Sequence, residues 1–147
     1  MLVEYLLVFL GGAIPWFEIL VVIPLGVFTG LNPALVILIG IVGNLSTLIP
    51  LVIAFEKVKT WITDKSDSKK QSKRSARAKI MWNKYGLPGM IMLGPVVLGS
   101  HLAAFIGMTL GSSKQAVLIW STIAIVIWAL VLGIATALGF EAFVPKQ

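Results

Sequence analysis

The sequence has 147 residues, of which 58% are hydrophobic and only 12% are charged, a balance that excludes an ordinary soluble domain and indicates a protein embedded in a lipid bilayer. Ten of the twelve Lys and Arg residues lie in the segment 56–84, so the net charge of +6 belongs to one loop and does not indicate a nucleic-acid-binding surface. The absence of cysteine excludes disulfides, thiol catalysis and zinc–thiolate sites.

The segment 1–30 is apolar but interrupted by glycines at 11 and 12 and by Pro15 and Pro24. These residues disfavour a continuous helix. A helix over 2–11 would be about 15 Å long and would reach only the middle of a hydrocarbon core about 30 Å thick. We therefore expect a broken segment that is re-entrant, with 18–30 as its returning leg. A full crossing is the alternative.

Glu18 lies in this broken segment. An ionised carboxylate at the centre of a bilayer costs at least ~2.5 kcal/mol, so Glu18 should face protein or water, or be protonated. Either state is suited to proton coupling. Pro15 and Pro24 flank it and leave backbone groups that are tolerated at this depth only beside protein or a wet cavity. The alternative is that Glu18 lies in an exposed loop at the membrane interface.

The segment 33–55 is uncharged over 23 residues and would be about 35 Å long as a helix, which predicts a transmembrane helix. It completes a first half-repeat, 1–55. Asn44 lies at its middle, on a face of small and polar residues. Such a face favours close helix packing or a contribution to a polar site.

The basic segment 56–84 is predicted to be a cytoplasmic linker, since Lys and Arg accumulate on the cytoplasmic side of membrane proteins. Part of it could form a short helix on anionic lipid, at about 1 kcal/mol for each basic residue near the surface. The positive-inside tendency alone would explain most of this pattern. The residues assigned to this lipid-facing surface are Lys69, Lys73, Arg74 and Arg77.

A second half-repeat, 85–147, contains a broken segment 87–111 and an uncharged stretch 115–140 that predicts a second transmembrane helix. We place the break at Gly94 and Pro95. His101, the only histidine, follows this break. It is either a proton-relay partner of Glu18 or a neutral imidazole bonded to the backbone.

The two halves align at an offset of 81 residues, with each broken segment followed by an uninterrupted span. This predicts an inverted repeat whose site lies between the two broken segments. Parallel halves are the alternative topology, and chance similarity is the alternative explanation. Two Gly-x-x-x-Gly pairs coincide in the alignment and are assigned to helix packing: Gly26, Gly30, Gly107 and Gly111.

Three stretches carry a family resemblance: "AIPWFEILVVIPLGVFTGLNP" at 13–33, "GNLSTLIPL" at 43–51 and "KYGLPGMIMLGPVVLGSHLAAFIGMTLGSSK" at 84–114. Together they resemble the prokaryotic small multi-drug export protein family over nearly the whole chain, which implies a multi-pass protein of the cytoplasmic membrane assigned to export. The order of segments is also distantly similar to the DedA superfamily, linked to movement of lipid carriers such as undecaprenyl phosphate. Glu18 would match the membrane-embedded acid of that superfamily. The arginines that usually flank its second proline are missing here.

We therefore expect an all-α integral membrane protein of the cell membrane that acts as a secondary transporter, exporting a small amphipathic compound in a proton-coupled manner. The alternatives are a flippase for polyprenyl phosphate or another lipid, and a non-transporting scaffold. No catalytic motif or metal-spaced cluster occurs, so we expect no enzyme, metal or cofactor. The small size predicts a homo-oligomer, a dimer, with membrane lipids as further partners. The expected midplane site comprises Glu18, His101, Pro15, Pro24, Asn44 and Pro95.

Overall fold

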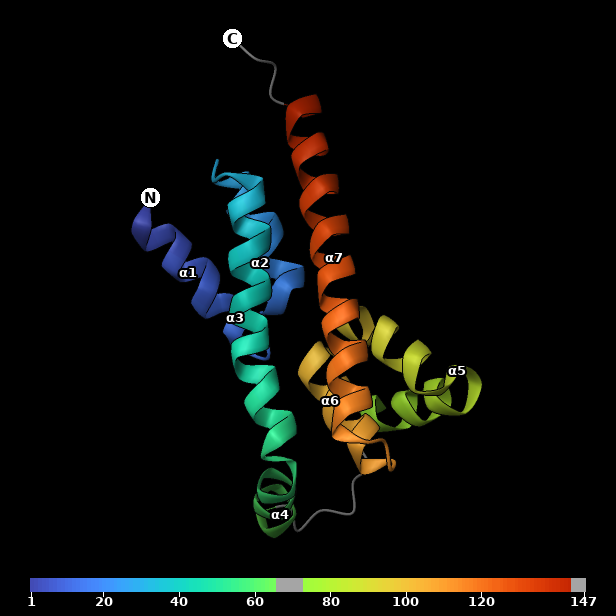
Figure 1. Cartoon of the computed structure of the whole chain (residues 1–147). Helices are drawn as coiled ribbons and strands as arrows, with labels where there is room; N and C mark the ends of the chain where they lie inside the picture. The colour runs from blue at the N-terminus through green and yellow to red at the C-terminus, as the bar shows by residue number, and fades with distance from the viewer. Residues whose placement is uncertain (66–72, 144–147) are drawn as a thin grey trace.

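The computed structural model describes residues 1–65 and 73–143, with side chains described for 1–61 and 76–139. Throughout these residues the regular structure is helical and contains no strand. The two longest uninterrupted helices, α3 and α7, run along the long axis of the molecule (Figure 1). The helices are α1 (Leu2–Ala13), α2 (Glu18–Phe28), α3 (Pro33–Ile53), α4 (Phe55–Lys65), α5 (Lys73–Val97), α6 (Ser100–Thr109) and α7 (Lys114–Phe143).

Two of these helices are long and apolar enough to cross a membrane, over Pro33–Ile53 and Lys114–Gly139. The two predicted spans, 33–55 and 115–140, are thereby confirmed as helices to within two residues at each end. Asn32 is the N-cap of α3. Its Oδ1 accepts hydrogen bonds from the backbone amides of Ala34 and Leu35.

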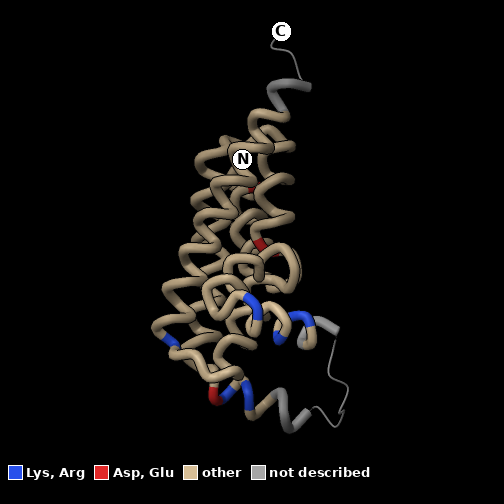
Figure 2. Tube along the Cα trace, turned by 90° about the vertical axis from the view of Figure 1, so that its right-hand side faces the viewer, with Lys and Arg blue, Asp and Glu red and all other residues tan. Residues whose placement is uncertain are grey.

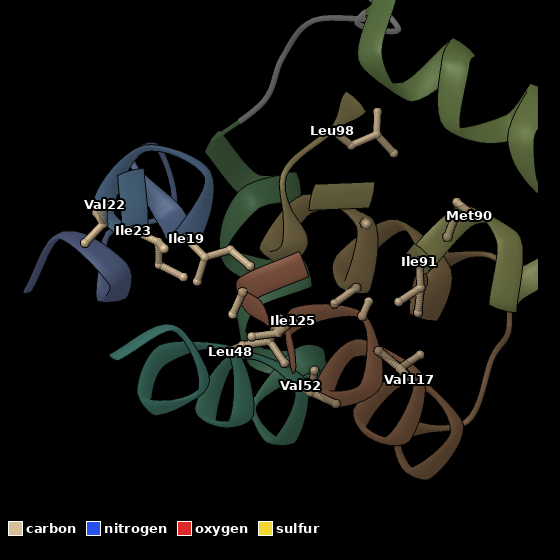
Figure 3. Close-up of a cluster of buried hydrophobic side chains, with 14 of the residues drawn as sticks. Ile19, Val22, Ile23, Leu48, Val52, Met90, Ile91, Leu98, Val117 and Ile125 are labelled. Atoms are coloured by element: carbon tan, nitrogen blue, oxygen red, sulfur yellow. The ribbon is translucent and has the colours of Figure 1, made fainter. Parts of the chain in front are cut away.

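The helices α3 and α7 are antiparallel. Lys114, at the start of α7, donates a hydrogen bond from Nζ to the carbonyl of Ile53 at the end of α3 (3.0 Å). Further along, Gly133 of α7 lies directly against the side chain of Ile37. Several helices contribute buried aliphatic side chains to the core (Figure 3), among them Ile19, Ile23, Leu48, Val52, Ile91, Val117 and Ile125.

The first broken segment consists of two short helices, α1 and α2, joined by residues 14–17. With 12 and 11 residues they are about 18 and 17 Å long, roughly half of a hydrocarbon core. Glycines permit α1 to approach the middle of α3. A Cβ on Gly12 would lie 2.9 Å from the carbonyl oxygen of Gly40, and one on Gly43 would collide with the Phe9 carbonyl.

The predicted interruption at Pro24 is wrong, because α2 continues through this residue. A proline removes one hydrogen bond from a helix interior and crowds the preceding turn. Burial of the neighbouring turns offsets this cost, since Ile19 and Ile23 are completely buried and Val27 is 3% exposed. Packing against the rest of the fold therefore maintains a helix that sequence propensity alone disfavours.

The predicted position of the second break, at Gly94 and Pro95, is also wrong. Both residues lie in the last turns of α5, which ends at Val97. The carbonyl of Gly94 accepts hydrogen bonds from the amides of Leu98 (2.8 Å) and Gly99 (2.7 Å). The chain then changes direction at Gly99, whose φ of 92° is one that glycine adopts without strain.

The helices α2 and α6 end in the same way. Gly30 (φ 86°) and Gly111 (φ 104°) adopt left-handed conformations just beyond the two helices, as in a glycine-terminated helix end. The predicted packing role of these two glycines is wrong, since an added Cβ would meet no atom within 4 Å at either position. Equivalent backbone bonds close both ends: Leu31 N to Gly26 O at 3.2 Å, and Ser112 N to Gly107 O at 3.1 Å.

The other two glycines of the predicted pairs do lie in packed surroundings. A Cβ on Gly26 would be 2.9 Å from a methyl group of Val36, and one on Gly107 would be 3.0 Å from a methyl group of Leu87. A side chain at either position would require the neighbouring methyl group to move. Within each Gly-x-x-x-Gly pair, the first glycine permits a close approach and the second ends the helix.

The Lys and Arg residues of the described chain gather toward the end of the molecule at which α3 ends (Figure 2). The predicted linker 56–84 comprises α4 and the first part of α5. Lys69 lies outside the described residues, and the side chains of Lys73 and Arg74 are likewise outside the described set. Arg77 is exposed on α5.

Candidate functional site

Glu18 is the first residue of α2 and is 3% exposed. Its Oε2 accepts a hydrogen bond from the backbone amide of Ser100 (2.7 Å), and its Oε1 accepts one from the amide of His101 (3.3 Å). These are the first two amides of α6, so the carboxylate occupies the positive end of that helix. Glu18 itself has a φ of 45°, unusual for a residue with a side chain and maintained here by these contacts.

His101 connects this carboxylate to a hydroxyl group. Its Nδ1 lies 3.0 Å from Glu18 Oε1, and its Nε2 lies 2.8 Å from Thr47 Oγ1. The Thr47 hydroxyl also lies 2.8 Å from the carbonyl oxygen of Ala13, the last residue of α1. A continuous set of hydrogen bonds therefore joins α2, α6, α3 and α1. It lies where α1 gives way to α2 and where α5 gives way to α6.

Asn44 is fully buried next to this network. Its Oδ1 accepts a hydrogen bond from the Ser100 hydroxyl at 3.1 Å, whereas its Nδ2 has no partner among the described residues. The buried hydroxyl of Ser121 on α7 likewise has no partner there. Leaving a buried polar group unpaired costs about 1–3 kcal/mol, so both groups are available to a bound water or ligand atom.

Gly99 provides the space that the carboxylate occupies. A Cβ at this position would lie 3.2 Å from Glu18 Oε1, and the φ of 92° would strain any other residue. Gly99 and Glu18 are separated by 81 residues, the offset at which the two halves align. Glu18 begins the short helix α2, and Gly99 immediately precedes the short helix α6.

Two cavities lie beside the first broken segment, and Glu18 of the network lines the smaller of them. The smaller, of about 180 Å³, lies between the breaks and is lined by Pro15, Glu18, Pro95 and Gly99 among others, none of its lining residues being Lys or Arg. The larger, of about 520 Å³, is an apolar groove between α1 and α2. Phe17 and Val21 line both cavities.

The structure therefore brings together most of the residues that the sequence analysis assigned to a site. Glu18 and His101 are in direct contact, Asn44 joins them through Ser100, and Pro15 and Pro95 line the adjoining cavity. Pro24 lines neither cavity, so the structure does not bring it to the site.

Sequence reasoning did not assign Gly99, Ser100 or Thr47 to the site. Thr47 could have been found from its spacing of three from Asn44, which places both on one face of α3. Gly99 could have been found from its alignment with Glu18. No signal indicated Ser100, because its main contribution to the carboxylate is a backbone amide that most residues would supply.

The order of carboxylate, imidazole and hydroxyl resembles a hydrolase triad, but its surroundings favour a different use. The amides of α6 that could bind an oxyanion are occupied by Glu18, and the Thr47 hydroxyl is bonded to Ala13. No group of His, Cys, Asp and Glu able to hold a metal occurs among the described residues. What this arrangement can do chemically is hold a proton and move it along the hydrogen bonds.

Comparison with known families gives one result. The sequence model of a family described as small multi-drug export proteins matches residues 18–131, well over half of the chain. The matched range begins at Glu18. It includes His101, the whole of α3 and the part of α7 up to residue 131. The family is assigned to export by its name. Comparisons with curated proteins and with solved structures found no match.

Proposed function

Because the chain belongs to the small multi-drug export protein family, we propose that it is a membrane transporter that couples proton movement at Glu18 and His101 to export of small amphipathic compounds. The burial of Glu18, 3% exposed among helices of membrane-spanning composition and bonded to His101, carries this proposal. An acid in such surroundings is costly, and apolar side chains would serve packing equally well. Its use in binding a proton supplies a reason for the cost.

The hydrogen bonds suggest how a proton would act. With the proton of neutral His101 on Nδ1, the ring donates to Glu18 and its Nε2 accepts from the Thr47 hydroxyl. A proton arriving at Nε2 reverses the second bond, so that Nε2–H donates to Thr47 Oγ1. The hydroxyl proton then turns to the Ala13 carbonyl, 2.8 Å away. Proton binding would thus neutralise the pair and strengthen the link between α3 and the end of α1.

The cavities supply a route for an amphipathic compound. The groove between α1 and α2 is lined almost entirely by apolar residues and would admit a compound from the lipid. Phe17 and Val21 line both this groove and the cavity beside Glu18, and the compound would pass from one to the other at these residues. That cavity, of about 180 Å³, is smaller than the ~300 Å³ expected for a drug-sized ligand. We therefore propose that a second copy, in a homodimer, completes the path.

Alternating access would follow from two inverted halves. The antiparallel α3 and α7 support this arrangement, as do the short α1 and α2, which are too short to cross and would be re-entrant. The basic end would be cytoplasmic in a multi-pass protein of the cell membrane. Backbone features recur at the offset of 81: positive φ at Glu18 and Gly99, positive φ at Gly30 and Gly111, and helix starts at Pro33 and Lys114.

Replacement of Glu18 tests the proposal. In vesicles reconstituted with purified protein and an imposed pH gradient, wild type should move ethidium, followed by its fluorescence, and Glu18→Gln should abolish that movement. Glu56→Gln is the matched control, because Glu56 is an exposed acid on α4 that lines neither cavity. Gradient-driven movement that persists in Glu18→Gln would refute the assignment of the proton site, as would an equal loss of movement in Glu56→Gln.

A lipid flippase of the DedA type is the second candidate. The start of α2 has no side-chain cap and adjoins the small cavity, where its backbone amides could bind a phosphate. The absence of Lys and Arg from the cavity lining counts against this candidate. Copurification of a polyprenyl phosphate, detected by mass spectrometry and lost on enlarging the Gly99 side chain, would favour the flippase over drug export.

A further inference from the structure

The first part of α5 is a separate structural unit. Gly86 adopts φ 71° and ψ −169°, a combination essentially restricted to glycine, and divides α5 into 73–85 and 87–97. We call 73–85 the basic arm. It extends sideways from α7, whereas α3 and α7 run along the long axis (Figure 1). The arm therefore has the direction of a helix lying across the end of the molecule and not along its spans.

One face of the basic arm packs on the protein. Ala78 is fully buried, Met81 is 9% exposed, and Trp82 is half-buried against the core. These positions follow the i, i+3, i+4 spacing that places residues on one side of a helix. The arm is thus attached to the fold by a defined apolar face, which fixes the direction in which its other side points.

The opposite face is positively charged with an apolar residue within it. Arg77, Ile80 and Lys84 are spaced i, i+3, i+7 and are all exposed, Ile80 to 65%. An exposed isoleucine between two cations is unfavourable in water. It is typical of a helix that lies in a membrane interface, with its apolar side chain toward the acyl chains and its basic heads at the phosphates.

The cations of this face have no carboxylate partner in the described protein. No Asp or Glu occurs between residues 68 and 140 of the sequence. The ion pairs among the described residues join Glu4 to the N-terminus and Glu18 to His101. The arm also lies toward the end of the molecule where the other basic residues gather (Figure 2). Its charge is therefore complementary to an external anionic surface at that end.

We propose that the basic arm lies in the membrane interface and binds anionic lipid headgroups through Arg77 and Lys84, with Ile80 inserted beside them. The arm would anchor Gly86 at the bilayer surface and so set the depth of the leg 87–97. The far end of that leg leads to Gly99 and to the amides that bind Glu18. Anionic lipid bound to the arm would thereby help to position the amides that bind Glu18. This effect does not depend on which compound the site binds.

A single thiol at Ile80 tests the position of the arm. The natural chain has no cysteine, so Ile80→Cys in the full-length protein provides one labelling site for a fluorophore. In nanodiscs of phosphatidylcholine with phosphatidylglycerol, the label should be shielded from the neutral aqueous quencher acrylamide. In pure phosphatidylcholine, or after Arg77→Gln with Lys84→Gln in the mixed lipid, quenching should increase several-fold.

Lipid affinity supplies the second measurement. Each basic residue near an anionic surface contributes roughly a fivefold effect, so Arg77→Gln with Lys84→Gln should weaken phosphatidylglycerol binding about 30-fold in a native mass spectrometry titration. Lys57→Gln with Lys59→Gln removes the same charge from α4 and should leave the Ile80 label shielded. Equal quenching in both lipids, or an equal effect of the two double variants on the label, would overturn the proposal. Neither result would bear on proton coupling at Glu18.

Discussion

Glu18 Oε1 lies 3.0 Å from His101 Nδ1, although the two residues are 83 positions apart in the chain. The same carboxylate accepts hydrogen bonds from the first amides of α6, the helix that carries His101. One side chain therefore joins the two broken segments and also orients the imidazole. Under the proposed function, a change in the protonation of this pair would act on the contact between these two segments.

Replacing His101 with asparagine should separate the two roles of the ring. Asparagine can place an amide near the position of Nδ1 but is too short to reach Thr47, so the contact with Glu18 would survive and the connection to α3 would be lost. We expect His101→Asn to abolish proton-driven ethidium movement in vesicles while the protein still folds. Folding is checked by size-exclusion chromatography and thermal unfolding in detergent.

A double-mutant cycle measures the energy of the Glu18–His101 contact. Groups in one hydrogen-bond network typically show coupling of about 0.5–3 kcal/mol, so Glu18→Gln and His101→Asn should be non-additive by this amount in the free energy of unfolding. Additive effects of the two replacements would show that the contact contributes no stability, and would weaken its assignment as the joint between the halves.

Thr47 should be required for the link between α3 and α1. Valine has nearly the same shape but no hydroxyl, so Thr47→Val leaves the Ala13 carbonyl and His101 Nε2 without this partner. We expect a loss of about 1–3 kcal/mol in the free energy of unfolding, together with a loss of proton-driven movement. Thr47→Ser should restore both, because it returns the hydroxyl.

Ser46→Ala is the matched control for this replacement. Among the described residues, the Ser46 hydroxyl donates a hydrogen bond only within its own helix, to the carbonyl of Gly43 at 2.6 Å. Its removal should change stability little. If Thr47→Val and Ser46→Ala behaved alike in both assays, the hydroxyl would have no special connection to the end of α1.

The long helices were predictable because crossing a bilayer imposes a minimum length of uncharged sequence, and α3 and α7 meet it without interruption. The contact between Glu18 and His101 was predictable for a related reason. Ionisable residues within apolar membrane segments are expected to pair with one another. The proton role given to this pair stays a prediction.

The errors arose where tertiary packing determines the backbone. Pro24 and Pro95 are expected to end helices, yet both lie inside helices that are buried on neighbouring turns. Gly30 and Gly111 were assigned to packing because a Gly-x-x-x-Gly spacing gives no information on φ. At the site, the backbone amides at the start of α6 donate hydrogen bonds to Glu18. Every residue except proline has such an amide, so no sequence pattern predicts this contribution.

Gly99 should tolerate no side chain. Gly99→Ala combines a strained backbone, at φ 92°, with a Cβ 3.2 Å from Glu18 Oε1. We expect a loss of about 1–3 kcal/mol in the free energy of unfolding and impaired proton coupling. Gly139→Ala is the control, because this glycine is helical with open space around it and should be neutral or stabilising by up to ~1 kcal/mol. Equal stability of the two variants would contradict the proposed close approach.

The orientation of α3 can be tested with single thiols, since the chain has no cysteine. Ala34, at the start of α3, and Thr60, on α4 beyond its end, are both exposed and lie at opposite ends of the span. Because the basic end should be cytoplasmic, Ala34→Cys should react with a membrane-impermeant maleimide in intact cells, and Thr60→Cys only after permeabilisation. Labelling of both from outside would show that α3 does not cross the membrane. Labelling of Thr60→Cys alone would show that the protein has the reverse orientation, with its basic arm on the outer surface.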